Sequence, residues 1–143
     1  MNIKLLEDKS IIDELELLRS QAFGFDTVAS TYYSELLFND KMTVILAYIN
    51  DELAGAAYVT RFNHSTCIVD QLFVKPKYQF TDYHVGTELL KYIERNINSI
   101  KDDYEDHVNR LLISPGSEES EKIYRDQGYQ DTRLDGTLYK RVR

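Results

Sequence analysis

Residues 67–97 restrict the possible folds of this chain most, because they join an apolar strand directly to an amphipathic helix. The first eight residues, CIVDQLFV, are mostly apolar and predict a largely buried strand. The loop KPKYQFTDYH follows, and VGTELLKYIERNI has the spacing of a helix that opens at Gly86. The first N–H groups of a helix have no partner within it and carry partial positive charge. The segment therefore predicts an anion site suited to phosphate.

Apolar periodicity elsewhere predicts helices and strands in a regular order around this segment. Two helices are expected early in the chain, near residues 10–24 and 26–37. Short turns separate the strands expected at 43–49, 53–62 and 67–74, so these three should form an antiparallel meander. The other expected elements are a strand at 3–6, a strand at 110–114, a helix capped by Ser117 and ending at Gly128, and a hairpin of 129–133 with 137–142.

Length and charge narrow the class of protein further. The 143 residues suit a single domain that spans residues 1–143. The net charge of −7, without a cluster of Lys and Arg, argues against a nucleic-acid partner and favours a cationic small molecule. No apolar stretch could span a bilayer and no apolar signal core is visible, so no membrane partner and a cytoplasmic location are expected. The single Cys67 is expected to be a core residue, and the acidic segment 101–107 lacks metal-ligand spacing, so no metal is expected.

Three local patterns, in this order of elements, resemble the GNAT superfamily of acyl-CoA N-acyltransferases over nearly the whole chain. They are DQLFV followed by KPKYQ, the helix start YHVGTELLKYIE, and SEESEKIYRDQGYQ with its Tyr124 and Gly128. The resemblance implies an α+β fold, with a mixed, mainly antiparallel sheet of about seven strands flanked by about four helices. It also implies an N-acetyltransferase that moves an acetyl group from acetyl-CoA to a primary amine of a small molecule or peptide by direct attack.

The resemblance also implies where acetyl-CoA would bind. The pantetheine arm would pair with the backbone of Leu72, Phe73 and Val74, and the pyrophosphate would lie on the helix that follows. The acceptor amine would be recognised by the first two helices, the residues between them and the last hairpin. Further residues expected at the cofactor are Gln79, Tyr83, His84, Val85, Gly86, Thr87, Ser117 and Tyr124. An ordinary helix cap explains Ser117 equally well.

The phosphate loop departs from the family pattern Q/R-x-x-G-x-G/A. Counted back from Leu89, the pattern falls on residues 81–86, where only Gly86 matches and His84 replaces a glycine. Alternatively, Gln79 is the polar residue of the pattern and the loop is two residues longer. His84 must point away from the phosphates or contact them itself. The departure leaves a second function open, a non-catalytic GNAT-like module that binds an acyl-CoA or a protein partner, and a homodimer through an exposed strand edge is also open.

Three side chains are candidates for the chemistry. Period-2 alternation would place Asp70 among Ile68, Leu72 and Val74, and such apolar surroundings would raise its pKa and make it a better general base. The alternative for Asp70 is a solvent-facing side chain. His84 competes for the role of base because histidine titrates near neutral pH. Tyr124 matches the family position of the group that donates a proton to the departing CoA thiolate.

Overall fold

The computed structural model describes residues 1–7, 9–23, 42–63, 65–97, 108–132 and 136–142. Its elements, in chain order, are β1 (Asn2–Leu5), the 3-10 helix η1 (Lys9–Ile11), α1 (Ile12–Phe23), β2 (Thr43–Ile49), β3 (Glu52–Asn63), β4 (Thr66–Val74), the 3-10 helix η3 (Pro76–Tyr78), α3 (Val85–Asn96), β5 (Arg110–Ile113), α4 (Glu118–Asp126), β6 (Gln130–Asp131) and β7 (Leu138–Arg141).

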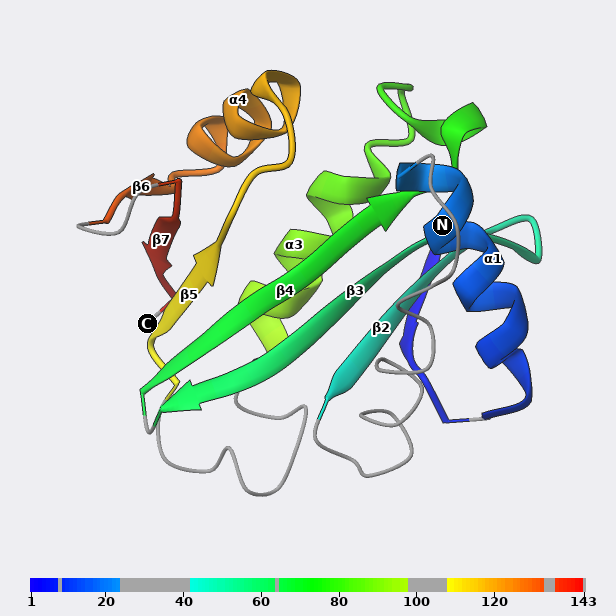
Figure 1. Cartoon of the computed structure of the whole chain (residues 1–143), viewed down its shortest axis with the longest axis horizontal. Coiled ribbons are helices and arrows are strands. Elements are labelled where there is room, and N and C mark those ends of the chain that lie inside the picture. The colour runs from blue at the N-terminus through cyan, green and yellow to red at the C-terminus, as the bar shows by residue number, and fades with distance from the viewer. Residues whose placement is uncertain (8, 24–41, 64, 98–107, 133–135, 143) are drawn as a thin grey trace.

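The strands form one seven-stranded sheet in the order β1-β2-β3-β4-β5-β7-β6 (Figure 1). All neighbouring pairs are antiparallel except β4 and β5, which are parallel. The expected α+β fold with a mixed, mainly antiparallel sheet is therefore confirmed, as is the meander of β2, β3 and β4. The crossover that joins the two parallel strands contains α3, which fits the rule that parallel neighbours need a long connection.

Helices cover both faces of the sheet, because alternate side chains of a strand point to opposite faces. On β2, Val44 and Leu46 pack with Leu15 and other apolar side chains of α1. Their neighbours Ile45 and Ala47 belong to the second core, which contains the buried face of α3 and Tyr124 of α4. This second core also contains Cys67, which is fully buried as expected. The sheet therefore separates an α1 side from an α3 side.

Element boundaries differ from the sequence-based expectations in small ways. The first helix is preceded by the 3-10 turn that contains Ser10, and α3 begins at Val85, one residue before Gly86. The last hairpin is shorter than expected, because β6 lies at the sheet edge and pairs with β7 through only two residues. The helix expected at 26–37 and the acidic segment 101–107 lie outside the described residues. None of the helices in the described ranges is long and apolar enough to cross a membrane.

Candidate active site

The sheet opens between β4 and β5. The two strands pair only where Thr66–Val69 meets Arg110–Ile113, and they diverge beyond this point (Figure 1). Among the described residues, no strand pairs with residues 70–74 of β4 on the β5 side. The expected pantetheine-binding residues Leu72, Phe73 and Val74 lie in this stretch. Their backbone can therefore receive an extended ligand as an additional half-strand.

The loop after β4 is attached to the start of β3 through a group we call the Glu52 cluster, made of Glu52, Lys75, Lys77 and Tyr78. The Glu52 carboxylate accepts hydrogen bonds from Lys75 Nζ at 2.7 Å and from the Tyr78 hydroxyl at 2.8 Å, and Lys77 Nζ lies 2.7 Å from its Oε2. Hydrogen bonds from these three side chains lower the pKa of the Glu52 carboxylate to about 2, and Lys75 has the largest effect. Sequence reasoning missed this cluster, because Glu52 is 23 residues from Lys75 and 26 from Tyr78.

Further hydrogen bonds fold the loop back on itself. The side-chain amide of Gln79 donates to the Val74 carbonyl at 2.8 Å, and the Thr81 hydroxyl donates to the Tyr78 carbonyl at 2.8 Å. The His84 N–H donates to the Thr81 carbonyl at 3.2 Å. Gln79, expected at the cofactor, therefore already has a local partner. These bonds hold the end of β4 close to the start of α3.

The first turn of α3 presents the amides predicted for anion binding. The first hydrogen bond along the helix runs from the Glu88 N–H to the His84 carbonyl at 2.9 Å, so the N–H groups of Val85, Gly86 and Thr87 precede it. His84 has φ 52° and ψ 46°, and its exposed side chain makes no capping hydrogen bond. Glycine adopts this left-handed conformation most readily. The backbone therefore supports the alignment that places His84 at the motif glycine.

Two glycines bring α3 close to the sheet. A Cβ atom built on Gly86 would lie 3.4 Å from Leu72 Cδ2, so the helix start lies directly over the opened part of β4. A Cβ atom on Gly55 of β3 would lie 2.8 Å from Val85 Cγ1 and 2.9 Å from the Phe73 carbonyl oxygen. Sequence reasoning did not select Gly55, although a glycine inside the apolar run LAGAAYV is a known sign of close backbone approach.

Tyr124 lies on α4, which follows β5. Ser117 caps this helix, its Oγ accepting from the Ser120 N–H at 3.1 Å, so the capping expectation is confirmed. Tyr124 is only 6% exposed, and its ring centroid is 6.2 Å from that of Tyr129. Burial raises the pKa of Tyr124 to about 12, although a hydrogen bond with the Ser120 side chain lowers this pKa by a smaller amount. Tyr124 therefore keeps its proton at neutral pH and can act as a hydrogen-bond donor.

The expected surroundings of Asp70 are wrong, because its side chain is exposed. The register between β3 and β4 shifts at this point. Tyr58 is opposite Gln71 and the next residue, Val59, is opposite Val69, which leaves Asp70 as an extra residue of β4. A bulge of this kind bends a strand and interrupts its alternation.

The bulge changes which residues share a face. Cys67 and Val69 before it, and Leu72 and Val74 after it, all pack with the core on the α3 side. Uninterrupted alternation would have placed Asp70 on the same face as Leu72 and Val74. Because of the extra residue, odd-numbered residues face the α3 side before the bulge and even-numbered residues face it after the bulge. The assignment of Asp70 as a base, like those of His84 and Tyr124, stays a prediction.

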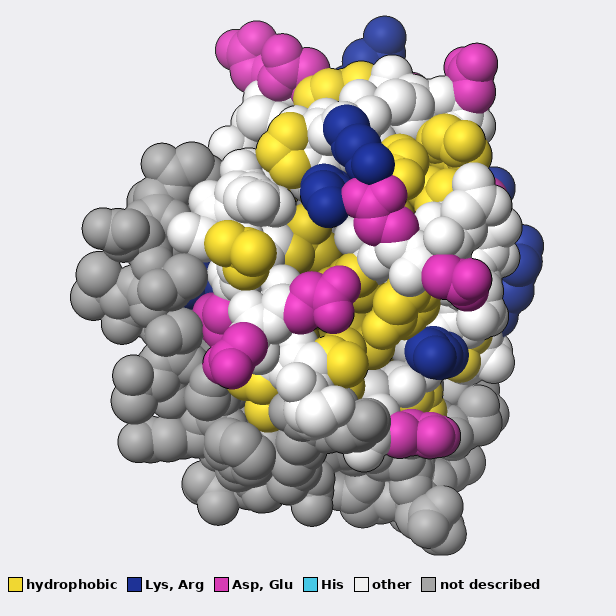
Figure 2. All heavy atoms as spheres, turned by 90° about the vertical axis from the view of Figure 1, so that its right-hand side faces the viewer, with side chains coloured by type: hydrophobic (Ala, Val, Ile, Leu, Met, Phe, Trp, Pro, Cys, Tyr) yellow, Lys and Arg dark blue, Asp and Glu magenta, His cyan; other side chains and the backbone are white. Residues whose placement is uncertain are grey.

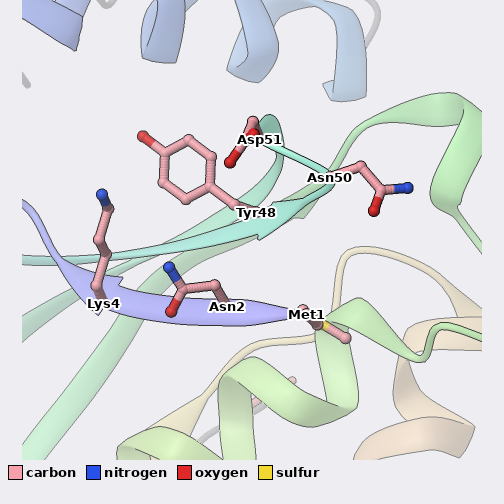
Figure 3. A pocket seen from close by; sticks show the side chains of 6 residues that line it. All are labelled: Met1, Asn2, Lys4, Tyr48, Asn50 and Asp51. Atoms are coloured by element: carbon pink, nitrogen blue, oxygen red, sulfur yellow. The ribbon is translucent and has the colours of Figure 1, made fainter.

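A separate pocket of about 390 Å³ lies at the β1–β2 edge of the sheet (Figure 3). Lys4 reaches over the ring of Tyr48 there, with Nζ 4.8 Å from the ring centroid. Because β3 separates β2 from β4, this pocket is not part of the opening between β4 and β5. The pocket is lined by Met1, Asn2, Lys4, Tyr48, Asn50 and Asp51.

Within the described ranges, no three His, Cys, Asp or Glu side chains are grouped to hold a metal ion.

The described residues thus form a mixed sheet that opens between two parallel strands, with a helix start over the opening. The family model for the acetyltransferase (GNAT) domain matches residues 8–138, and the chain belongs to this family. None of the curated proteins compared with the chain matches it.

Solved structures share the fold at low sequence identity. The aminoglycoside 6'-N-acetyltransferase from Enterococcus faecium superposes with a TM-score of 0.78 at 15% identity, covering 100% of this chain and 98% of that one. The PaiA N-acetyltransferase from Thermoplasma acidophilum, in complex with coenzyme A, gives 0.73 at 14% identity and 99% coverage of both chains. The ribosomal-protein-alanine N-acetyltransferase from Brucella melitensis gives 0.70 at 16% identity, again with 99% coverage of both.

Replacing His84 with glycine is expected to stabilise the protein by up to about 1 kcal/mol, because glycine adopts a left-handed backbone without a Cβ penalty. Thermal unfolding measures this change. Acetyl-CoA affinity, measured by calorimetry, should stay the same or increase, since the amides of α3 belong to the backbone. Asn also tolerates this conformation, so His84→Asn is the matched control. A loss of affinity in both variants would show that the imidazole itself contacts the ligand.

Proposed function

We propose that this protein transfers an acetyl group from acetyl-CoA to a primary amine of a small molecule or peptide by direct attack. The observation that supports this most is the opening between β4 and β5, which ends at the start of α3. A strand edge and a row of helix-start amides suit the two ends of one ligand, an amide-containing arm and a pyrophosphate. We place the acceptor on the α1 side of the sheet, because the family resemblance assigns acceptor recognition partly to the first helix.

Acetyl-CoA fits the residues around this opening. The backbone of Leu72, Phe73 and Val74 pairs with the pantetheine arm, and the amides of Val85, Gly86 and Thr87 bind the pyrophosphate. Tyr83 and His84 directly precede these amides, so we assign both to the cofactor-binding loop. Ser117 is placed at the pantetheine through the hydroxyl that already caps α4. The coenzyme A in the Thermoplasma PaiA structure supports the choice of ligand.

Direct attack forms a C–N bond between the acceptor and the acetyl carbonyl and breaks the C–S bond of the thioester. Asp70 takes the proton from the attacking amine, through water because its side chain is exposed. A backbone N–H of β4 stabilises the negative charge that develops on the carbonyl oxygen. The departing thiolate receives a hydrogen bond from Tyr124. His84 is the less suitable base, because it lies at the phosphate end of the opening.

The acceptor is expected to be cationic before it loses its proton. The chain carries a net charge of −7, and acidic side chains are spread over the face in Figure 2, among apolar and basic groups. Such a surface attracts amines over long distances. Polyamines, amino sugars, amino acids and peptide N-termini should therefore be screened, with release of free thiol from acetyl-CoA as the readout.

Acetyl-CoA is expected to raise the melting temperature. A ligand that binds only the folded state at about 100 times its Kd adds about 2.7 kcal/mol to the free energy of unfolding. For a chain of this size that is a shift of roughly 8 to 12 °C. CoA without the acetyl group is the comparison, and a buffer blank is the control. No shift at millimolar acetyl-CoA would exclude both the enzyme and an acyl-CoA-binding module.

Replacing Asp70 with asparagine is expected to lower kcat by about 100-fold and to leave the KM for acetyl-CoA nearly unchanged, because a general base typically contributes 10²- to 10⁴-fold. Steady-state rates of thiol release at varied acetyl-CoA measure both constants. Asp51→Asn is the matched control, since Asp51 is an exposed acid in the β2–β3 turn whose left-handed backbone suits asparagine equally well. A kcat that is unchanged in Asp70→Asn and lowered in His84→Gln would assign the base to His84.

A non-catalytic module is the second candidate, and the replacement of a motif glycine by His84 favours it. Binding of acetyl-CoA without thiol release for any acceptor in the screen would support this alternative. Thiol release that is abolished in Asp70→Asn would exclude it.

A further inference from the structure

Two large aromatic side chains are exposed on the loop between β4 and α3. Phe80 is 71% exposed and Tyr83 is 49% exposed. In the described residues only three other large apolar side chains are exposed, and they lie on other elements. Phe80 also has φ 55°, a backbone conformation that a bulky residue rarely adopts. Neither side chain belongs to a core cluster, so core packing does not explain this pair.

The loop holds the ring of Tyr83 in place before any ligand binds. The ring of Tyr83 packs edge-on against Tyr78, with 5.6 Å between centroids and 88° between planes. Tyr78 in turn donates its hydroxyl to Glu52, and its carbonyl accepts from Thr81. An edge contact covers only part of Tyr83, which leaves ring surface accessible to a ligand. A preformed aromatic surface binds with a smaller entropic cost than a mobile one.

The position of the loop relative to α3 identifies what these rings can reach. Tyr83 is two residues before Val85, so their Cα atoms are at most about 7.6 Å apart. The hydrogen bond from the His84 N–H to the Thr81 carbonyl closes the intervening turn. Thr81 directly follows Phe80, so Phe80 also stays close to the helix start. In acetyl-CoA, one ribose joins the pyrophosphate to the adenine base. A base whose pyrophosphate lies on α3 is therefore within reach of this loop.

We propose that Phe80 and Tyr83 form a stacking site for the adenine base of acetyl-CoA. The proposal rests on the proposed function, because it requires the pyrophosphate to lie on α3. Stacking of a base on an aromatic side chain changes affinity by roughly 5- to 150-fold when the side chain is truncated to alanine. Contacts to the base would then supply binding energy in a loop that retains only one glycine of the phosphate motif.

Calorimetric Kd values for two ligands test the proposal. Acetyl-CoA carries the adenosine, whereas S-acetyl-4'-phosphopantetheine lacks it together with the 3'-phosphate and one phosphate of the pyrophosphate. Phe80→Ala and Tyr83→Ala are each expected to weaken acetyl-CoA binding by about 10-fold and to leave the Kd of the truncated ligand unchanged. Tyr83→Phe should bind acetyl-CoA like the wild type, because it keeps the ring. Phe62→Ala removes a 62% exposed ring at the opposite end of β3 and should change neither Kd.

The failures of the two proposals can be distinguished. If the wild type binds acetyl-CoA and both alanine variants bind it equally well, the stacking site is wrong and the proposed function stands. If either variant weakens both ligands to the same extent, the ring shapes the helix start instead of stacking on adenine, and the proposal is again wrong. Wild-type protein that binds neither ligand would overturn the proposed function as well. A melting curve of each variant checks that it is folded. Phe80→Ala should melt like the wild type, because the ring that it removes is mostly exposed.

Discussion

Replacing Tyr124 with phenylalanine is expected to lower kcat by about 10- to 100-fold while changing the KM for acetyl-CoA little. The variant loses one hydrogen bond to the departing thiolate, and bonds to charged groups contribute about 1.5 to 3 kcal/mol. A donor that acts only as charge develops affects the chemical step more than binding. Steady-state rates of thiol release at saturating acceptor measure the change. Unaltered turnover would remove Tyr124 from the mechanism.

The pKa of Tyr124 indicates whether it transfers its proton to the thiolate or only donates a hydrogen bond. Full proton transfer from a group with a pKa of about 12 to a thiolate with a pKa of about 8.5 is uphill by about 5 kcal/mol. A hydrogen bond that stabilises the thiolate without complete transfer is therefore the better description. It follows that kcat should not fall with rising pH through titration of Tyr124 until the pH is well above 10.

Tyr129 provides a matched control for this substitution. It belongs to the same core as Tyr124 and is 2% exposed, and burial, followed by the nearby Glu94 carboxylate, raises the pKa of its hydroxyl. Tyr129→Phe should leave kcat unchanged. The melting temperature should change little, because the variant keeps the buried ring and removes only the hydroxyl. An equal loss of kcat in both variants would point to packing as the cause.

Replacing Gly55 with alanine is expected to destabilise the protein by about 1 to 3 kcal/mol and to weaken acetyl-CoA binding. The added methyl would meet Val85 Cγ1 at 2.8 Å and the Phe73 carbonyl oxygen at 2.9 Å. The valine can shift only if the first turn of α3 moves, and the carbonyl belongs to a paired strand, so overpacking is expected. Thermal unfolding should show a decrease of roughly 4 to 10 °C.

Gly116→Ala is the control for Gly55→Ala. A Cβ atom on Gly116 would have no atom within 4 Å, and its stability should change by less than about 0.5 kcal/mol. If Gly55→Ala retained both the wild-type melting temperature and the wild-type Kd for acetyl-CoA, the close approach of α3 to β3 would not control the position of the amides at the start of α3.

Most of the fold could be predicted from the sequence, because strand and helix periodicity are local properties. The run TVILAYI becomes β2 with the expected boundaries, and residues 67–97 contain the strand, loop and helix in the expected order. Ser117 caps α4 because a serine before a helical segment supplies the acceptor that the first amides lack. The resemblance implied a mixed sheet, but neither it nor any local pattern predicted that β4 and β5 are the parallel pair.

The site could be predicted only in part, because its geometry depends on residues far apart in the sequence. The amides of Val85, Gly86 and Thr87 were predictable from the helix start alone. The exposure of Asp70 was not, since the bulge arises from how β3 and β4 align. Glu52 has no local feature that marks it, and its role comes from the lysines that the fold brings to it.

The sequence by itself determined where the strand-loop-helix of residues 67–97 lies and that its helix start suits an anion, because the spacing of apolar residues and the free amides of a first turn are local. Only the tertiary structure decided what surrounds that helix start. Pairing between β4 and β5 stops after Val69, Gly55 admits α3 to the sheet, and His84 takes the backbone conformation of a glycine without being one. The first two depend on contacts between distant segments and the third on how the loop closes on itself, and periodicity along one segment encodes neither.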